Sequence, residues 1–188
     1  MGKNKSIGKR ISISEHQDST TVVIESTITK IQQISLEMWL GGWTGLGCLL
    51  GYGAITFSGD ERLVYLGSLI FWTFFWIRIS KVVAWRRIGK EVIVIKRTSA
   101  MIKNAFGKKG RERFFEISKM SPVIFQENDS ASFLQELDKS YWILGGDTLH
   151  FTYEGKTHVF GKQLDNKDSI QLANVVNKSL KKFVLFIA

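Results

Sequence analysis

Two long apolar stretches, separated by five residues, constrain this chain more than any other feature of its sequence. Residues 38–57 are 20 consecutive residues without a charge, and residues 63–85 carry only Arg78 and Lys81. A helix needs about 20 apolar residues to cross the hydrocarbon layer, and lipid offers no hydrogen bonds to a non-helical backbone. The two stretches therefore predict a membrane hairpin of antiparallel helices within residues 36–86. The alternative is a long hairpin buried in a soluble core.

Positive charges give the expected orientation of this hairpin. Lys and Arg residues precede the first stretch and follow the second, whereas the loop holds Asp60, Glu61 and Arg62. Because Lys and Arg stay on the cytoplasmic side, both termini are expected in the cytoplasm, at an inner or plasma membrane. Arg78 and Lys81 either snorkel to the headgroups or form a charged site inside the membrane. The residues expected at the membrane interface are Trp39, Arg78, Lys81, Trp85, Arg86 and Arg87.

The net charge also limits the classes of binding partner expected for the rest of the chain. The formal net charge is +9, and residues 86–188 contain 18 Lys and Arg against 11 Asp and Glu. A basic segment tethered to a membrane attracts anionic phospholipid, which makes such lipid a candidate partner. Nucleic acid is the other usual partner of basic proteins, but the sequence contains no nucleic-acid motif, so none is expected. The single cysteine, Cys48, excludes an internal disulfide.

The segment that follows the apolar stretches has the pattern of a small domain with strands first and a helix last. Glycine-containing turns at residues 107–110, 145–147 and 154–156 punctuate apolar or alternating runs, which predicts antiparallel strands. The predicted strands cover residues 91–97, 100–106, 111–118, 123–126, 141–144, 148–153 and 157–160, with a loop at 126–139. Residues 89–188 are therefore expected to form a cytoplasmic domain.

The two ends of the chain add one strand and one helix to this prediction. Residues 1–33 are expected to be a cytoplasmic segment whose first part, including His16, is a polar tail. Residues 20–29 alternate as a strand, and this strand could join the sheet of the C-terminal domain. A helix is expected after Asp165, because Ile170, Ala173, Val176, Leu180 and Phe183 recur at three- and four-residue spacing.

The order of six or seven strands and one amphipathic helix resembles that of a pleckstrin-homology-like (PH-like) β-barrel. Residues 149–180 resemble the terminal hairpin and capping helix of bacterial PH-like membrane proteins, through Phe160-Gly161, Leu164, Asp165-Asn166, Leu172, Asn177 and Leu180. The arrangement of two helices before such a domain is also similar to that of photosystem I assembly proteins, although the loop between the helices is much shorter here. The resemblance implies a membrane α-helical hairpin joined to an α+β domain, a PH-like barrel or sandwich capped by its C-terminal helix.

No pattern typical of catalysis is present in the sequence. It has no Gly-rich phosphate loop, His-Glu-x-x-His motif, cysteine pair or nucleophile elbow. His150 and His158 flank the Glu154-Gly155-Lys156 turn; a two-residue loop puts them on opposite faces of the hairpin and a three-residue loop on the same face. We therefore expect no catalytic, cofactor-binding or metal-ligating residue, and no enzyme activity.

Two features are candidates for function. Gly41, Gly45, Gly47 and Gly51 have small-xxx-small spacing, which suits packing against the second helix of the hairpin or against a partner subunit. The basic turn around Lys108, Lys109, Arg111 and Arg113 is either a solvated surface or a contact with anionic lipid headgroups, which PH-like domains bind in their early hairpin loops.

The expected function is that of a noncatalytic accessory, assembly or scaffolding subunit of a membrane complex. Its expected partners are integral membrane proteins, and further copies of the chain are candidates as well. The second expectation is an anionic-lipid-binding PH-like membrane module.

Overall fold

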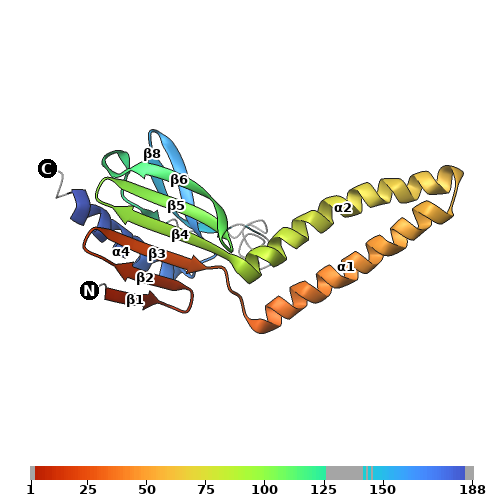
Figure 1. Cartoon of the computed structure of the whole chain (residues 1–188), viewed down its shortest axis with the longest axis horizontal. Helices are drawn as coiled ribbons and strands as arrows, with labels where there is room; N and C mark the ends of the chain where they lie inside the picture. Colours follow the sequence, from red (N-terminus) through yellow and green to blue (C-terminus); the bar gives the residue numbers. More distant parts are fainter. Residues whose placement is uncertain (1–2, 126–141, 143, 145, 185–188) are drawn as a thin grey trace. The chain divides into compact units, whose positions relative to one another are not determined.

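The computed structural model describes residues 3–125, 142, 144 and 146–184, which form two compact units. One unit combines residues 1–27 with 88–188, and the other consists of residues 28–87. The first is an α+β domain of two antiparallel sheets and a C-terminal helix; the second is a pair of long helices (Figure 1). In sequence, the two helices are thus an insertion between two parts of the sheet domain. The division expected from the sequence, with residues 1–33 apart from a domain at 89–188, differs from these units.

The larger sheet has six antiparallel strands that neighbour one another in chain order (Figure 1). Its strands are β1 (Lys3–Ile7), β2 (Ile11–Glu15), β3 (Ser19–Glu25), β4 (Gly89–Lys96), β5 (Ser99–Phe106) and β6 (Lys109–Glu116). β3 and β4 pair at its centre although 63 residues separate them in the sequence, and Val22 lies opposite Ile93. The strand expected at residues 20–29 corresponds to β3, which ends at Glu25 and joins the sheet of the C-terminal domain; residues 26–29 are not part of a strand.

β1 and β2 occupy the stretch that was expected to be a polar tail. Ile7, Ile11 and Ile13 are buried, whereas Ser12, between the two isoleucines of β2, is exposed. Gly8 makes the turn between the strands, with a positive φ of 56° that an L side chain rarely adopts. Three isoleucines among Ser, Lys and Asn give a weak strand pattern, so pairing with β3 decides the structure of this segment.

The smaller sheet contains β7 (Ile124–Phe125), β8 (Asp147–Tyr153) and β9 (Lys156–Lys162), in that order. A 3-10 helix, η1 (Ile117–Lys119), follows β6. The loop expected at residues 126–139 lies outside the described residues, as do Tyr141 and Ile143 of the strand expected at 141–144. The described residues of that strand, Trp142 and Leu144, lie in a turn and a bend.

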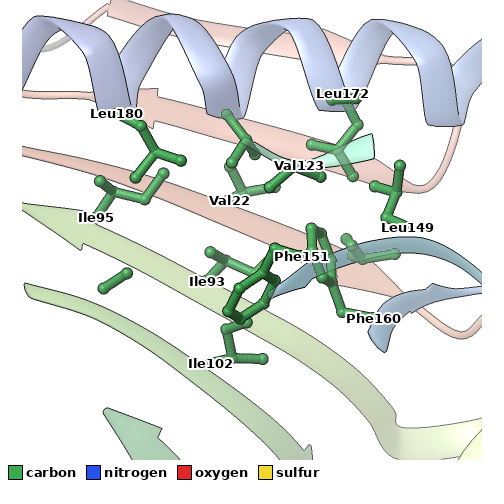
Figure 2. Packing of buried hydrophobic residues seen from close by; sticks show 14 of the residues in the cluster. Val22, Ile93, Ile95, Ile102, Val123, Leu149, Phe151, Phe160, Leu172 and Leu180 are labelled. Carbon is green, nitrogen blue, oxygen red and sulfur yellow. The ribbon is translucent and has the colours of Figure 1, made fainter. Parts of the chain in front are cut away.

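The core lies between the larger sheet, the smaller sheet and α4 (Asn166–Val184). Figure 2 shows Val22, Ile93 and Ile102 of the larger sheet on one side, with Phe151 and Phe160 of the smaller sheet and Leu172 and Leu180 of α4 around them. The apolar stripe expected on α4 is present at Ala173, Val176, Leu180 and Phe183. Ile170 departs from it, being 48% exposed, and Leu172 is fully buried instead.

The helical unit consists of α1 (Lys30–Thr56) and α2 (Gly59–Ile88). α1 begins eight residues before the apolar stretch because Thr29 and Gln32 form a capping box at its N-terminus. Asp60 and Glu61 lie in the first turn of α2, where negative charge stabilises the helix dipole. Indole N–H groups tie the helices together, since Trp72 donates to the carbonyl oxygen of Trp43 (2.7 Å) and Trp76 to Oγ1 of Thr44 (2.9 Å).

Among the described helices, α2 is long and apolar enough to cross a membrane, and none of the residues in its most apolar window is buried inside the structure. α1 does not reach the same mean hydropathy. Its charge-free stretch contains six glycines, Trp39, Trp43 and Tyr52, which contribute little hydropathy despite the absence of charge. By its length and composition, therefore, α1 does not qualify as the second membrane span that was expected from the sequence.

Candidate functional site

The β5–β6 turn brings the expected basic residues together at one edge of the larger sheet. Phe106 pairs with Lys109, so the turn has two central residues, Gly107 and Lys108, and Gly107 has a φ of 60°. A glycine at this first position suits the type II′ hairpin turn, whose twist matches that of the strands. Gly110 already lies in β6, where a Cβ would come 2.5 Å from the carbonyl oxygen of Asn104.

Alternation along β6 places Lys109, Arg111 and Arg113 on one face of the strand, the face that also carries the buried Phe115. Glu112 lies on the other face, where Lys103 donates to it at 2.8 Å. Within the described part of the chain, Lys108, Lys109, Arg111 and Arg113 form no ion pair. The edge strand therefore carries positive charge that the described carboxylates leave uncompensated.

The β5–β6 turn lies beside the point where the chain enters the sheet domain from α2. Gly107 donates its backbone N–H to the carbonyl oxygen of Ile88, the last residue of α2, at 3.1 Å. Gly89 pairs with Phe106, and its carbonyl oxygen accepts from the backbone N–H of Ser26 at 3.2 Å. The chain thus leaves the sheet, re-enters it and makes its basic turn at one end of the domain.

A second basic group lies on β9 and was not expected from the sequence. Tyr153 pairs with Lys156, and Glu154 and Gly155 both have positive φ (47° and 74°), which defines a two-residue type I′ turn. Of the two alternatives left open by the sequence, the two-residue loop is present, and His150 and His158 lie on opposite faces. Lys156 and His158 share the face of buried Phe160; this alternation was the signal that could have identified them.

His158 lies between aromatic rings at the edge of the core. Its ring centroid is 4.8 Å from that of Phe115 on β6 and 5.5 Å from that of Phe151 on β8. Partial burial, followed by the positive charges of Arg113 and Lys156, lowers the pKa of His158 below its ordinary value of 6.5. The structure therefore brings Arg113 of β6 together with Lys156 and His158 of β9.

A buried ionic cluster lies close to the points where the chain leaves and re-enters the sheet domain. It was not expected from the sequence. Glu91 is 2% exposed; its Oε2 accepts from the backbone N–H groups of Gly161 (2.8 Å) and Lys162 (3.2 Å), and Lys162 Nζ lies 3.3 Å from its Oε1. Burial opposes the charge on Lys162, but Glu91 and Asp147 more than offset it and raise the pKa of Lys162. Glu91 alternates in phase with Ile93 and Ile95, which was the one sequence signal of its burial.

Arg10 extends this cluster to the β1–β2 turn. Its guanidinium donates to the carbonyl oxygens of Glu25 (2.8 Å), Gln163 (2.6 Å) and Lys162 (3.2 Å). Burial lowers the pKa of Arg10 below its ordinary value, while Asp165, Glu91 and Asp168 oppose that shift, so the group stays charged. The cluster joins strands from before and after the inserted helices and has a structural role.

The glycines of α1 divide into two groups. A Cβ on Gly47 would come 2.1 Å from the ring of Trp72, so this glycine packs against α2. Gly53 lies against Tyr65 in the same way. A Cβ on Gly41, Gly45 or Gly51 would meet nothing within 4 Å. The four glycines singled out in the sequence therefore do not form one packing face.

The residues expected at a membrane interface lie near the N-terminus of α1 and along the C-terminal part of α2. Trp39 stacks on Trp43 with ring centroids 6.1 Å apart. Arg78 lies over the ring of Phe74 at 5.6 Å, and Arg87 Nε lies 3.8 Å from Oε1 of Glu37. Lys81, Trp85 and Arg86 belong to the same part of α2.

No group of three or more His, Cys, Asp or Glu side chains that could hold a metal ion occurs among the described residues. Comparison of the chain with known protein families, with curated proteins and with solved structures gives no match.

Proposed function

We propose that this protein is a noncatalytic, membrane-anchored module whose PH-like domain contacts anionic lipid headgroups through the β5–β6 turn. In this proposal α1 and α2 cross the membrane as a hairpin, and both termini are cytoplasmic. The observation that carries it is the hydrogen bond from Gly107 to Ile88, because it keeps Lys108 and Lys109 next to the end of the apolar helix.

Three features support the hairpin as a membrane anchor. α2 has the length and composition of a membrane span, and the Trp72 and Trp76 hydrogen bonds hold α1 alongside it. At 1.5 Å per residue the two helices are about 40 and 45 Å long, which exceeds the roughly 30 Å hydrocarbon core. Arg78, Lys81, Arg86 and Arg87 all lie toward the domain end of α2, which favours a cytoplasmic domain.

The PH-like assignment has support from the architecture alone. Two antiparallel sheets enclose a core, and α4 packs against that core through Leu172, Val176 and Leu180. In such a domain the basic turn would contact the membrane from the end that carries the helix junctions. At roughly 1 kcal/mol per well-placed cation, Lys108 and Lys109 would add a modest, salt-dependent attraction to anionic lipid.

Site-directed labelling tests this contact. In a Cys48→Ser background, we expect a spin label at Lys108→Cys to report the headgroup region in nanodiscs, and to do so more strongly when phosphatidylcholine is partly replaced by phosphatidylglycerol. A label at Thr98→Cys is the control, because Thr98 lies in the β4–β5 turn, a strand length of about 23 Å from Gly89. Equal accessibility at both sites, in both lipids, would contradict the proposal.

An accessory subunit of a membrane complex is the second candidate function. The observation that favours it is the open space around Gly41, Gly45 and Gly51, since small residues let another helix approach closely. The partner would be an integral membrane protein or a second copy of the chain.

Two glycine substitutions separate packing within the hairpin from packing against a partner. Gly47→Leu is expected to disrupt the hairpin, because the new side chain overlaps Trp72. Gly45→Leu is expected to leave the hairpin intact and to reduce co-purification of a partner in mild detergent several-fold. Hairpin integrity is measured by cross-linking α1 to α2. An unchanged set of co-purifying proteins with Gly45→Leu would count against this surface as a docking site.

A further inference from the structure

Arg113, Lys156 and His158 meet at the edge of the core from two different sheets. The contact between the rings of Phe115 and His158 places β6 opposite β9 at this point. Arg113 lies two residues before Phe115 on the same face of β6, and Lys156 lies two residues before His158 on the same face of β9. Both cations lie near enough to His158 for their charges to act on its ring.

The neighbouring carboxylates are committed to other partners. Glu112 lies on the opposite face of β6 and accepts from Lys103 at 2.8 Å. Glu116 and Glu154 both pair with Lys119, at 3.4 and 3.2 Å. Among the residues that the structure describes, neither Arg113 nor Lys156 forms an ion pair. Positive charge at this half-buried position is left without a counter-charge.

The imidazole of His158 is held in place rather than free to turn into solvent. Its ring stacks on Phe151 at an angle of 24° between the planes and meets Phe115 edge-on, with Tyr153 at 6.3 Å. These apolar neighbours exclude water from one side of the ring, which strengthens any charge–charge contact on the other side.

We infer that Arg113, Lys156 and His158 form a binding site for a doubly charged oxyanion of the phosphate class. The Arg113 fork can donate two parallel hydrogen bonds to such an anion, and Lys156 and His158 can each add one. The site is separate from the proposed membrane contact, since Arg113 is four residues along β6 from Lys109, about 13 Å away. The ligand is either a soluble phosphate ester or a phospholipid headgroup.

Binding at this site is linked to protonation of His158. The charged groups that act on the ring are Arg113 from β6 and Lys156 from β9, and Tyr153 faces it from β8. Because both charges are positive, they disfavour the imidazolium; a bound dianion reverses that balance and raises the pKa of His158. By reciprocity, affinity for the anion rises as pH falls through the range in which His158 becomes protonated.

Inorganic sulfate tests the inference in the full chain in neutral detergent, because sulfate stays doubly charged between pH 5 and 8 while phosphate itself titrates. The ring signals of His16, His150 and His158 are followed by NMR and assigned with His158→Gln. We expect saturable movement of the His158 signal alone, a higher pKa of His158 with sulfate, and tighter binding at pH 5.5 than at pH 7.5. Inorganic phosphate should give the same response at fixed pH.

Matched variants distinguish specific anion binding at this site from non-specific electrostatic screening by the added salt. Arg113→Gln is expected to weaken binding at least tenfold, and Lys156→Gln, in an exposed position, serves if Arg113→Gln misfolds. Lys103→Gln removes the same charge from the other face of the sheet and should leave binding unchanged. Linear, equal movement of all three histidine signals, or equal loss with Lys103→Gln, would overturn the inference.

Nanodiscs identify the source of the anion. A shift of the His158 signal on replacing phosphatidylcholine by phosphatidic acid, reversed by free phosphate, assigns a lipid headgroup. A response to the free anions without a response to phosphatidic acid assigns a soluble ligand. Absence of both responses overturns the site, and it leaves the membrane contact at Lys108 untouched because the label at that position tests it independently.

Discussion

Residues 89–188 expressed alone are expected to remain unfolded, whereas residues 1–27 joined to residues 88–188 by a short Gly/Ser linker are expected to fold. The first segment supplies β3, the central partner of β4, and five buried core residues, Ile7, Ile11, Ile13, Val22 and Ile24. At about 1.5–3 kcal/mol for each buried side chain, they contribute roughly 7–15 kcal/mol. That range equals the total stability of a typical domain, so the C-terminal segment alone lacks the core it needs.

The linker can be short because the two chain ends lie side by side within the domain. The Ser26 backbone N–H donates to the Gly89 carbonyl oxygen at 3.2 Å, and four linker residues reach about 13 Å. Far-UV circular dichroism and urea unfolding measure the outcome. The control is the linked chain with Val22→Asp, which puts a charge at a fully buried position opposite Ile93 and should abolish folding. Cooperative unfolding of residues 89–188 alone would contradict this prediction.

Glu91→Ala is expected to cost the sheet domain about 3–5 kcal/mol of unfolding free energy. The change leaves the backbone N–H groups of Gly161 and Lys162 without their buried acceptor, and it leaves the ammonium of Lys162 with Asp147 as its remaining described carboxylate partner. Replacing both partners, as in Glu91→Leu with Lys162→Met, should cost less than the single change, because the ammonium that Glu91 neutralised is removed with it, and the Asp147 carboxylate left behind is 20% exposed. Amide hydrogen exchange of β4 and β9 in the full chain measures these losses.

Glu112→Ala is the matched control for the buried pair. It removes a carboxylate with one lysine partner on the same sheet, but the Glu112 side chain is 41% exposed. Exposed pairs contribute about 0–1 kcal/mol, so exchange in β4 and β9 should hardly change. A loss as large as that of Glu91→Ala would argue against burial as the cause.

Alkaline pH should reproduce part of the Glu91 effect. The pKa of Lys162 is raised in the folded protein, so its contribution is complete below the ordinary lysine value of 10.5 and is lost as pH rises through the folded value. In Lys162→Met this part of the alkaline destabilisation should be absent.

Local patterns predicted the strands and hairpins of the C-terminal segment well. β4, β5, β6, β8 and β9 begin and end within two residues of the expected ranges, because alternating apolar residues and Gly-containing turns specify antiparallel hairpins locally. The terminal helix was predicted because its apolar residues recur at three- and four-residue spacing, which is also a local pattern. Its stripe was misjudged at Ile170 and Leu172, since Ile170 is three residues before Ala173 and Leu172 four residues before Val176, so both fit the spacing of the stripe and packing decides which one is buried.

The basic turn could be located from the sequence, but its neighbours could not. Lys108, Lys109, Arg111 and Arg113 stand out as a charge run. Their position beside Ile88 follows from the β4–β5 register, and the approach of His158 to Arg113 follows from the packing of β6 against β9. Neither contact involves residues that are close in the sequence.

By itself the sequence determined the apolar character of α2, the antiparallel hairpins and the amphipathic final helix, because each depends on residues within a few positions of one another. Only the tertiary structure decided that β1, β2 and β3 complete the sheet across the inserted helices, that Glu91 is buried in an ion pair, and that His158 of β9 lies against Phe115 of β6 and near Arg113. Pairing between distant strands depends on the burial of whole sheet faces and on hydrogen bonding of buried polar groups. Neither can be read from the local periodicity of the sequence.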